Sequence, residues 1–272
     1  MIAPGLGRAS QTLDSLTARI IDTRIREPHD EPIDLLDLLS TGQDGQPLSR
    51  AEIRDEVMTL VIAGHETTTN ALTFMLPLLS QIPAAYERLI AEVDDVLRGR
   101  DPAAADVEVL PWTQAVVSEA LRLYPPACYI NRDAAQDDDL LGIPVSAGDT
   151  VGLSPYLLHR HPEFWPEPER FEPQRFLPEN ASTRPRYAYV PFGGGRHMCL
   201  GARLAQLELT LILAVLSQSV RLDLVPTAPL RARADVTLNT VGPVMATVTP
   251  AHPSRHSIRV QVLPSSVHRR DG

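Results

Sequence analysis

The sequence predicts a mainly α-helical protein with small β-sheets. Hydrophobic residues recur at helical spacing through most of the N-terminal half, and again over about 200–219. Short β-type runs separated by glycine-containing turns lie over 127–152, and further strand-like runs follow residue 220. Hydrophobic residues make up 43% of the 272 residues and charged residues 22%, so the chain has an ordinary globular composition and can bury a core.

The N-terminal part is expected to contain three helices. Residues 10–27 form an amphipathic pattern, and 33–39 form a short second one that begins near Asp34. After a polar turn at 42–47, a long helix is expected over about 49–81, because Ser and Glu three residues apart form a capping box at its start. The hydrophobic residues that share one face of this helix are Ile53, Val57, Leu60, Val61 and Gly64.

Proline and glycine mark the later elements. Pro83 opens a helix that stops at Gly99, and Pro125 ends another that covers about 111–124. Turns are expected at Gly142 and Gly148 within the β-type region. The remaining expected elements are a long ordered loop at 160–195, a helix at about 200–219, strands at 220–225, 236–238 and 244–248, and a frayed polar end after about 250.

Composition excludes several classes of function. The net charge is −9, which argues against a global nucleic-acid footprint. All 25 basic residues are Arg, so chemistry that depends on Lys is excluded, including a P-loop or a Schiff base. Cys128 and Cys199 are too few for a disulfide framework or a four-cysteine zinc site. There is no signal-peptide pattern, and the apolar stretch at 204–216 is too short to span a bilayer, so we expect a cytoplasmic protein.

The segment from Phe192 to Gly201 carries the strongest chemical signal. Three consecutive glycines cost conformational entropy, and a backbone pressed flat against a large planar ligand is one reason for them. Cys199 comes directly before the helix expected at about 200–219, and the amide groups at a helix N-terminus favour a thiolate. Arg196 and His197 are suited to pair with anionic groups of the same ligand. The alternative is a buried cysteine after a glycine-rich turn.

This segment resembles the haem-binding loop of the cytochromes P450, on Phe192, Gly195, His197, Cys199 and Gly201. The resemblance implies haem b with the Cys199 thiolate as the iron ligand and His197 at a haem propionate. The family more often has Arg at the position of His197. The other residues that the resemblance assigns to the haem pocket are Phe192, Gly193, Gly201, Ala63 and Arg132, the last at a propionate.

A second segment, 63–68, lies in the middle of the long predicted helix. Its Gly and Thr residues are poor helix formers, so local distortion is expected. A zinc helix of the His-Glu-x-x-His type is excluded because residue 69 is Thr. The segment resembles the oxygen-activating part of the P450 distal helix, which implies that Glu66 relays protons and that Thr67 holds the bound oxygen species and its water. The alternative is a partly buried polar face.

A third resemblance joins two distant segments. Glu119 and Arg122 lie three apart on one helix face, which by itself indicates only a surface ion pair. In the P450 family, such a pair bonds to a downstream Arg, here Arg175, and the network locks the loop below the haem. We expect this trio to be structural. Cys128 is expected to be a packing residue, and His159 a structural residue of a family loop.

The resemblance implies a haem-thiolate monooxygenase. Such an enzyme inserts one atom of dioxygen into a small hydrophobic organic substrate, with electrons from NAD(P)H delivered by a ferredoxin or flavoprotein reductase. Arg196 and Arg203 are candidates for the docking face of that partner. Residues 1–272 are expected to form a partial, N-terminally truncated P450 domain, because the earlier helices of the family have no counterpart here. The alternatives are an enzyme that uses peroxide without a reductase, and an inactive or weakly haem-binding truncated remnant.

Overall fold

A computed structural model describes residues 6–42, 46–181, 184–224 and 230–251. Part of the turn expected at 42–47 and nearly all of the polar end after 250 therefore lie outside the described residues. The helices are α1 (Leu6–Arg26), α2 (Leu35–Thr41), α3 (Arg50–Ser80), α4 (Pro83–Leu97), α5 (Pro111–Leu123), α6 (Pro155–Leu158), α7 (Pro178–Ala181) and α8 (Ala202–Ser219). Short 3-10 turns are η1 (Ala104–Val109), η2 (Pro173–Phe176), η3 (Arg186–Ala188) and η4 (Gly195–His197).

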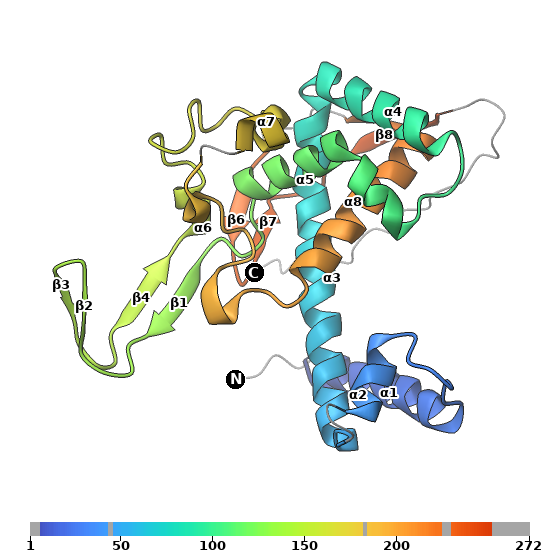
Figure 1. Ribbon diagram of the computed structural model, residues 1–272, viewed down its shortest axis with the longest axis vertical. Helices are drawn as coiled ribbons and strands as arrows, with labels where there is room; N and C mark the ends of the chain where they lie inside the picture. Colours follow the sequence, from blue (N-terminus) through green and yellow to red (C-terminus); the bar gives the residue numbers. More distant parts are fainter. Residues whose placement is uncertain (1–5, 43–45, 182–183, 225–229, 252–272) are drawn as a thin grey trace, which may run out of the picture.

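The long helix α3 is the axis of the structure. Its first turn is capped from both sides: Ser49 Oγ accepts the Glu52 N–H at 3.3 Å, and Glu52 Oε2 accepts the Ser49 N–H at 2.8 Å. Figure 1 shows α1 and α2 packed at the beginning of α3, and α4, α5 and α8 gathered around its other end. The described residues thus form two main hydrophobic cores along one helix, besides a small cluster of Phe74, Cys128 and Leu238.

The two cores differ greatly in size. Ile21, Leu36 and Ile53 form the small one between α1, α2 and the start of α3. The large one joins the C-terminal part of α3 to α4, α5 and α8, and its members with the smallest exposure include Met75, Leu89, Val93, Leu110, Val116 and Ala214. The residues at helical spacing in α4 and α5 bury their apolar stripes here, which is the usual source of stability for such helices.

Between the cores, α3 is uncovered, although its hydrophobic residues share one face there. The face that begins at Ile53 is buried there, but Val61 on the same face is 43% exposed. No residue from 54 to 70 is buried, and a Cβ added at Gly64 would meet no atom within 4 Å. Periodicity alone therefore identified the helix but not the part of it that is packed, because α1 and α2 reach only its first turns.

Among the described residues, the strands pair in four two-stranded antiparallel sheets: β1 (Ile130–Asp133) with β4 (Thr150–Leu153), β2 (Asp138–Leu140) with β3 (Ile143–Val145), β5 (Val220–Leu224) with β8 (Ala246–Pro250), and β6 (Ala232–Ala234) with β7 (Leu238–Thr240). The expected strand at 236–238 thus lies later, at β7, and its partner β6 was not foreseen. Strand β6 is too short and too rich in Ala to show a strand pattern in the sequence.

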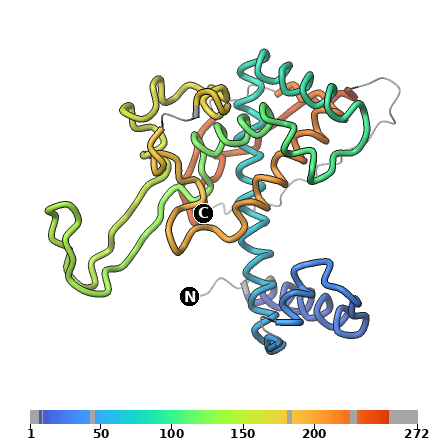
Figure 2. Tube along the Cα trace, viewed as in Figure 1, coloured from blue at the N-terminus to red at the C-terminus, as the bar shows by residue number. Residues whose placement is uncertain are grey.

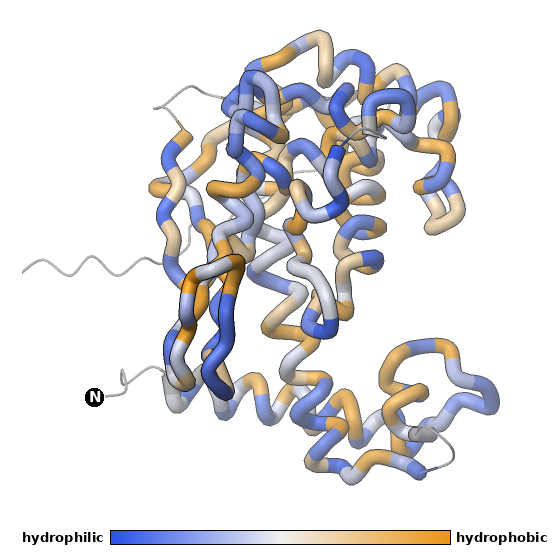
Figure 3. Tube along the Cα trace, turned by 60° about the vertical axis from the view of Figure 1, so that its left-hand side comes forward, coloured by the Kyte–Doolittle hydropathy of each residue, from blue (hydrophilic) through white to orange (hydrophobic). Residues whose placement is uncertain are grey.

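Strands β1 to β4 form an arm that leaves the helical body (Figure 2). Gly142 and Gly148, with φ of 87° and 90°, make the expected turns in it. Figure 3 shows hydrophobic as well as hydrophilic residues on this arm, and Leu141 and Ile143 are both exposed. None of the helices in the described ranges combines the length and the apolar character that crossing a bilayer requires.

A buried ion pair ties α5 to the segment that precedes the Cys199 loop. Arg122 donates from Nε and Nη2 to the two oxygens of Glu119 at 2.7 and 2.8 Å, and neither side chain is exposed. The guanidinium also donates to three backbone carbonyls in this segment, those of His159, Pro168 and Arg170, at 2.7–3.0 Å. Glu119 in turn accepts the Glu172 N–H at 2.8 Å. Burial raises the pKa of Glu119, and the bonds to Arg122 oppose this.

Arg175 lies beside this pair but is held differently. Its Nη2 is 2.8 Å from Glu172 Oε2, whereas its Nε is 3.6 Å from Glu119 Oε1, too far for a hydrogen bond. That Nε is the one buried side-chain nitrogen or oxygen in the described ranges without a hydrogen-bond partner. The three residues of the expected trio are thus neighbours, with the closest bonding confined to Glu119 and Arg122.

His159 extends the same connection toward the Cys199 loop. Its ring is fully buried; Nε2 accepts the Val190 N–H at 2.8 Å, and Nδ1 lies 3.1 Å from the carbonyl oxygen of Arg122. This pattern assigns the hydrogen to Nδ1 and a neutral ring. Burial lowers the pKa of His159 to about 4, since the charged form would lose its hydration.

We predict that Glu119→Gln destabilises the chain far more than Glu167→Gln. Glu167 forms an ion pair with Arg170 at the same i,i+3 spacing, but both side chains of that pair are more than half exposed. Losing Glu119 leaves a buried, unbalanced guanidinium, which costs about 3–5 kcal/mol. The exposed pair contributes about 0–1 kcal/mol. Urea unfolding followed by circular dichroism measures both, and equal losses in the two variants would contradict the buried role of Glu119.

His159 also predicts a dependence of stability on pH. Between about pH 6.5 and 4 the unfolded chain protonates this residue and the folded chain does not. The free energy of unfolding therefore falls as pH decreases through this window, by up to about 1.4 kcal/mol per pH unit from this residue. His159→Asn should be less stable at neutral pH but show a shallower decline below it. Identical slopes in the two proteins would rule out His159 as the cause.

Candidate active site

The Cys199 loop is closed by the main chain. The Cys199 N–H donates to the carbonyl oxygen of Phe192 at 2.9 Å, and the Met198 N–H donates to that of Gly195 at 3.2 Å. Phe192 itself packs against the large core, so the loop begins on a fixed point. Cys199 is a free cysteine and is exposed. The sequence thus presents a thiol at the tip of a loop that the helical body anchors.

Backbone conformation explains why two of the three consecutive positions in the loop are glycine. Gly193 and Gly195 adopt φ of 74° and 69°, in the left-handed region that residues with a side chain rarely enter. Gly194 is extended, and a Cβ there would make an ordinary contact at 3.4 Å with the Tyr187 ring. The expectation of a backbone flattened against a ligand is therefore unnecessary for Gly193 and Gly195, whose backbone angles suffice.

Helix α8 begins just beyond the cysteine. Its first residue is Ala202 and its N-cap is Gly201, two residues later than the start expected from sequence. A Cβ added at Gly201 would lie 4.0 Å from Cys199 Sγ, so the sulfur sits directly against this cap. The positive end of a helix dipole favours negative charge at such a position.

Two basic side chains flank the loop. His197 lies in η4 and Arg132 on β1, and both are exposed. The two elements are neighbours, because a Cβ added at Gly193 would lie 3.6 Å from Ile130 Cδ1 on β1. No carboxylate partner is found for His197 or Arg132 within the described residues. Both are therefore available to anionic groups of a ligand beside the loop.

The polar segment at 63–68 lies on the uncovered part of α3. Ala63 and Glu66 are exposed and Thr67 is half-buried. Figure 1 shows the loop that leads into α8 beside the central part of α3, and the two helices are in contact. The segment 63–68 and the loop that carries Cys199 thus belong to neighbouring elements of the structure.

The expected distortion of α3 is absent. The helix stays α-helical from Arg50 to Ser80, through the whole of 63–68. Thr67 Oγ1 donates to the Ala63 carbonyl oxygen at 2.7 Å, and Thr69 Oγ1 donates to that of His65 at 2.7 Å. These hydroxyls donate to carbonyl oxygens one turn earlier in the same helix, and the backbone stays α-helical around them.

Glu66 has partners that sequence reasoning missed. Its Oε1 accepts a hydrogen bond from Thr237 Oγ1 at 2.5 Å. Asn70, one turn further along α3, donates to Thr237 Oγ1 at 3.0 Å and to Asn239 Oδ1 at 2.9 Å. Thr237 and Asn239 belong to the β6–β7 hairpin. No sequence signal could have found this cluster, because its two halves are far apart in the chain and neither is a motif.

The residues around Cys199 fit a haem group. Haem is a large apolar ring with two carboxylates, and its iron accepts a cysteine thiolate. Leu200 is 90% exposed and Met198 57% exposed on either side of the thiol, so apolar surface adjoins the ligand atom. The exposed His197 and Arg132 match the carboxylates. The described residues hold no cluster of His, Cys, Asp and Glu suited to a metal ion on its own.

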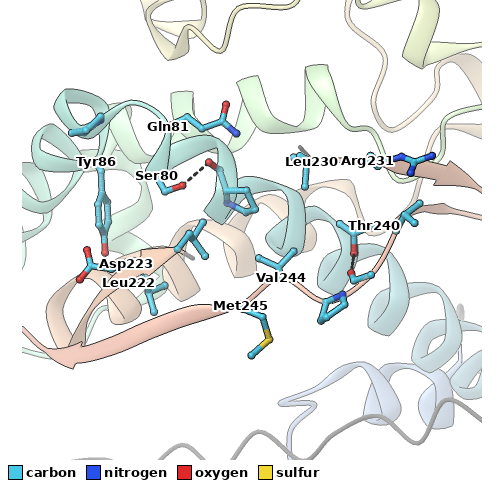
Figure 4. Close-up of a pocket in the computed structure, with 16 residues that line it drawn as sticks. Ser80, Gln81, Tyr86, Leu222, Asp223, Leu230, Arg231, Thr240, Val244 and Met245 are labelled. Atoms are coloured by element: carbon cyan, nitrogen blue, oxygen red, sulfur yellow. Dashed lines mark hydrogen bonds between the residues drawn. The ribbon is translucent and has the colours of Figure 1, made fainter. Parts of the chain in front are cut away.

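A separate cavity lies elsewhere in the structure. A cavity of about 450 Å³ opens between the end of α3, strand β5 and the segment 240–245 (Figure 4). Tyr86, Leu222 and Met245 are among its lining residues. None of the residues discussed above as site residues lines it. We therefore assign the chemistry to the surface around Cys199.

Comparison with known proteins agrees with this geometry. The family model described as cytochrome P450 matches residues 2–242. Cyclooctatin synthase of Streptomyces melanosporofaciens is 42% identical over 242 residues, which cover 88% of this chain and 52% of that protein. Pentalenene oxygenase of Streptomyces avermitilis is 37% identical over 246 residues, covering 90% and 52%. The chain spans about half the length of these relatives.

A solved structure shows the same fold. The cytochrome P450DA haem domain superposes with a TM-score of 0.82 at 32% identity, covering 92% of this chain and 57% of that one. The mainly α fold with small β-sheets is thus confirmed, and the likeness extends over nearly the whole chain. From the family match and this shared fold it follows that the chain belongs to the cytochrome P450 family.

Proposed function

We propose that this chain is the haem-binding portion of a monooxygenase, residues 1–272 forming part of one P450 domain. The observation that carries the proposal is the exposed Cys199 thiol, held in a closed loop against the start of α8. Two relatives are named for oxygenation, of pentalenene and of cyclooctat-9-en-7-ol, and this supports a small hydrophobic organic substrate. Electrons would come from NAD(P)H through a ferredoxin or flavoprotein reductase.

The residues divide into ligand, anchors and lining. Cys199 would hold the iron of haem b, and His197 and Arg132 would pair with its propionates. Phe192, Gly193, Gly201 and Ala63 would line the ring. Haem bound in this way supplies the dioxygen chemistry, since the thiolate donates electron density that favours O–O cleavage. The protein contributes the ligand, the protons and the shape of the pocket.

The remaining task of the chain is to deliver protons. Thr67 Oγ1 donates its hydrogen to Ala63 and keeps its two lone pairs free to accept from a water molecule. Glu66 precedes it on the exposed part of α3, where solvent can reach the side chain, and it would relay protons from there. Exposed Arg196 and Arg203 flank the Cys199 loop and offer a basic surface to an acidic electron donor.

A second candidate is a chain that binds haem weakly and does not turn over. It is favoured by the open middle of α3 and by the 90% exposure of Leu200, because a loosely enclosed haem is easily lost. A haem-thiolate enzyme that uses peroxide is less well supported, because that chemistry needs less of the proton delivery proposed for Glu66 and Thr67.

Spectroscopy of the haem-loaded chain separates these candidates. Reduced with dithionite and exposed to carbon monoxide, it should show the strongly red-shifted Soret band of a thiolate-ligated haem. Cys199→Ser should lose that band, whereas Cys128→Ser, which changes the other cysteine at a buried position, should keep it. Absence of haem uptake would favour the weakly binding chain. An unshifted band in the unaltered chain would refute thiolate ligation.

A further inference from the structure

The β6–β7 hairpin brings a set of polar side chains to Glu66. Thr237 Oγ1 lies 2.5 Å from Glu66 Oε1, and both Asn70 Nδ2 and Asn239 Nδ2 lie within 3.2 Å of the same hydroxyl. Thr237 is 9% exposed, so this hydroxyl is largely removed from water. The cluster belongs to no motif of the family resemblance and stands on these contacts alone.

The directions of these hydrogen bonds follow from one backbone group. The carbonyl oxygen of Thr237 only accepts, so the atom of Asn239 that lies 3.0 Å from it is the amide nitrogen. The oxygen of Asn239 then faces Asn70, which must present its own nitrogen, at 2.9 Å. Both amide nitrogens therefore point their hydrogens at Thr237 Oγ1.

The direction of the Thr237 hydroxyl hydrogen is fixed by the other contacts of its oxygen. A hydroxyl has one hydrogen and two lone pairs. Asn70 and Asn239 occupy both lone pairs, at 3.0 and 3.2 Å, so the hydrogen is directed at Glu66 Oε1. Oε1 is thereby committed as an acceptor, and a proton carried by Glu66 resides on the other oxygen, Oε2.

The hairpin that carries Thr237 is itself anchored. Leu238 is buried in a cluster with Phe74 of α3 and Cys128, and its N–H donates to the Pro126 carbonyl oxygen at 2.9 Å. Phe74 stacks on Tyr124 with ring centroids 4.3 Å apart. Thr237 is therefore held from both α3 and the end of α5, and it can fix the orientation of a side chain that is otherwise exposed.

We propose that Thr237 is a positioning residue for Glu66, supported by Asn70 and Asn239. It holds Oε1 of the carboxylate, so that Oε2 is the oxygen that takes up and releases the proton. This inference rests on the proposed function, in which Glu66 relays protons, and it adds three residues that the family motifs do not assign. The hairpin thus takes part in proton delivery as well as in the fold.

The first test needs no haem. The free energies of unfolding of the unaltered chain, Glu66→Leu, Thr237→Val and the double variant form a cycle for the pair, because Leu has no oxygen to accept the hydrogen bond. We expect Thr237→Val to lower the free energy of unfolding in the unaltered background and to have a smaller effect when Glu66 is already Leu. Thr69→Val is the matched control, because Thr69 Oγ1 bonds only to a carbonyl of its own helix. Additive effects of Glu66→Leu and Thr237→Val would overturn the proposal.

The second test uses the haem-loaded chain with NADPH and a surrogate ferredoxin and ferredoxin reductase. Hydrogen peroxide formed per NADPH consumed measures failed proton delivery. Thr237→Val should raise this fraction about two- to tenfold, the range that corresponds to one lost hydrogen bond. Thr237→Ser, which keeps the hydroxyl, should restore it, and Thr69→Val should leave it unchanged. A Thr237→Val value equal to that of Thr69→Val would overturn the proposal.

The two tests distinguish failure of the proposed function from failure of the inference about Thr237. A chain that takes up no haem counts against the proposed function, while the unfolding cycle still decides whether Thr237 holds Glu66. Coupling in the cycle together with an unchanged peroxide fraction would show a merely structural bond and reject the role in proton delivery.

Discussion

The pairing of Glu119 with Arg122 in the interior of the protein is the constraint on which the site depends. A fully buried guanidinium needs acceptors for its hydrogens, and Glu119 supplies only part of them. Carbonyl oxygens of His159, Pro168 and Arg170 supply the rest, so an irregular segment is bound to the regular helix α5. An irregular chain gains a fixed position in this way without forming secondary structure of its own.

From that pair a continuous path of contacts leads to the cysteine. Arg122 binds the carbonyl of His159, whose ring binds the Val190 N–H. Two residues later Phe192 packs against the large core, and its carbonyl accepts the Cys199 N–H. The loop is therefore formed by the packing of the helical body before any ligand is considered, which agrees with the view that active sites are built on rigid supports. In its middle part, α3 presents Glu66 and Thr67 where neither core covers it.

The elements predicted correctly from sequence are those set by local chemistry. The capping box at Ser49 begins α3. Glycines occupy positions 142 and 148 because the turns there need positive φ values, which glycine adopts without strain. The Cys199 loop was recognisable because its determinants are contiguous. Burial was less accessible: Val61 follows the same periodicity as Ile53 but faces no partner, since packing depends on elements elsewhere in the chain. Thr237 carried no signal at all, because its importance arises only where the hairpin meets α3.

The central claim is that the fold preforms the Cys199 loop through this path, and native-state hydrogen exchange of single backbone amides tests it most directly. The Val190 and Cys199 amides should open with the same free energy as amides in the middle of α5, because one cooperative unit would hold them all. Amides of the exposed β2–β3 arm, such as that of Gly142, should exchange much faster and serve as the reference for local opening. If Val190 and Cys199 instead exchange as readily as Gly142 while α5 stays protected, the loop is not preformed and the account is wrong.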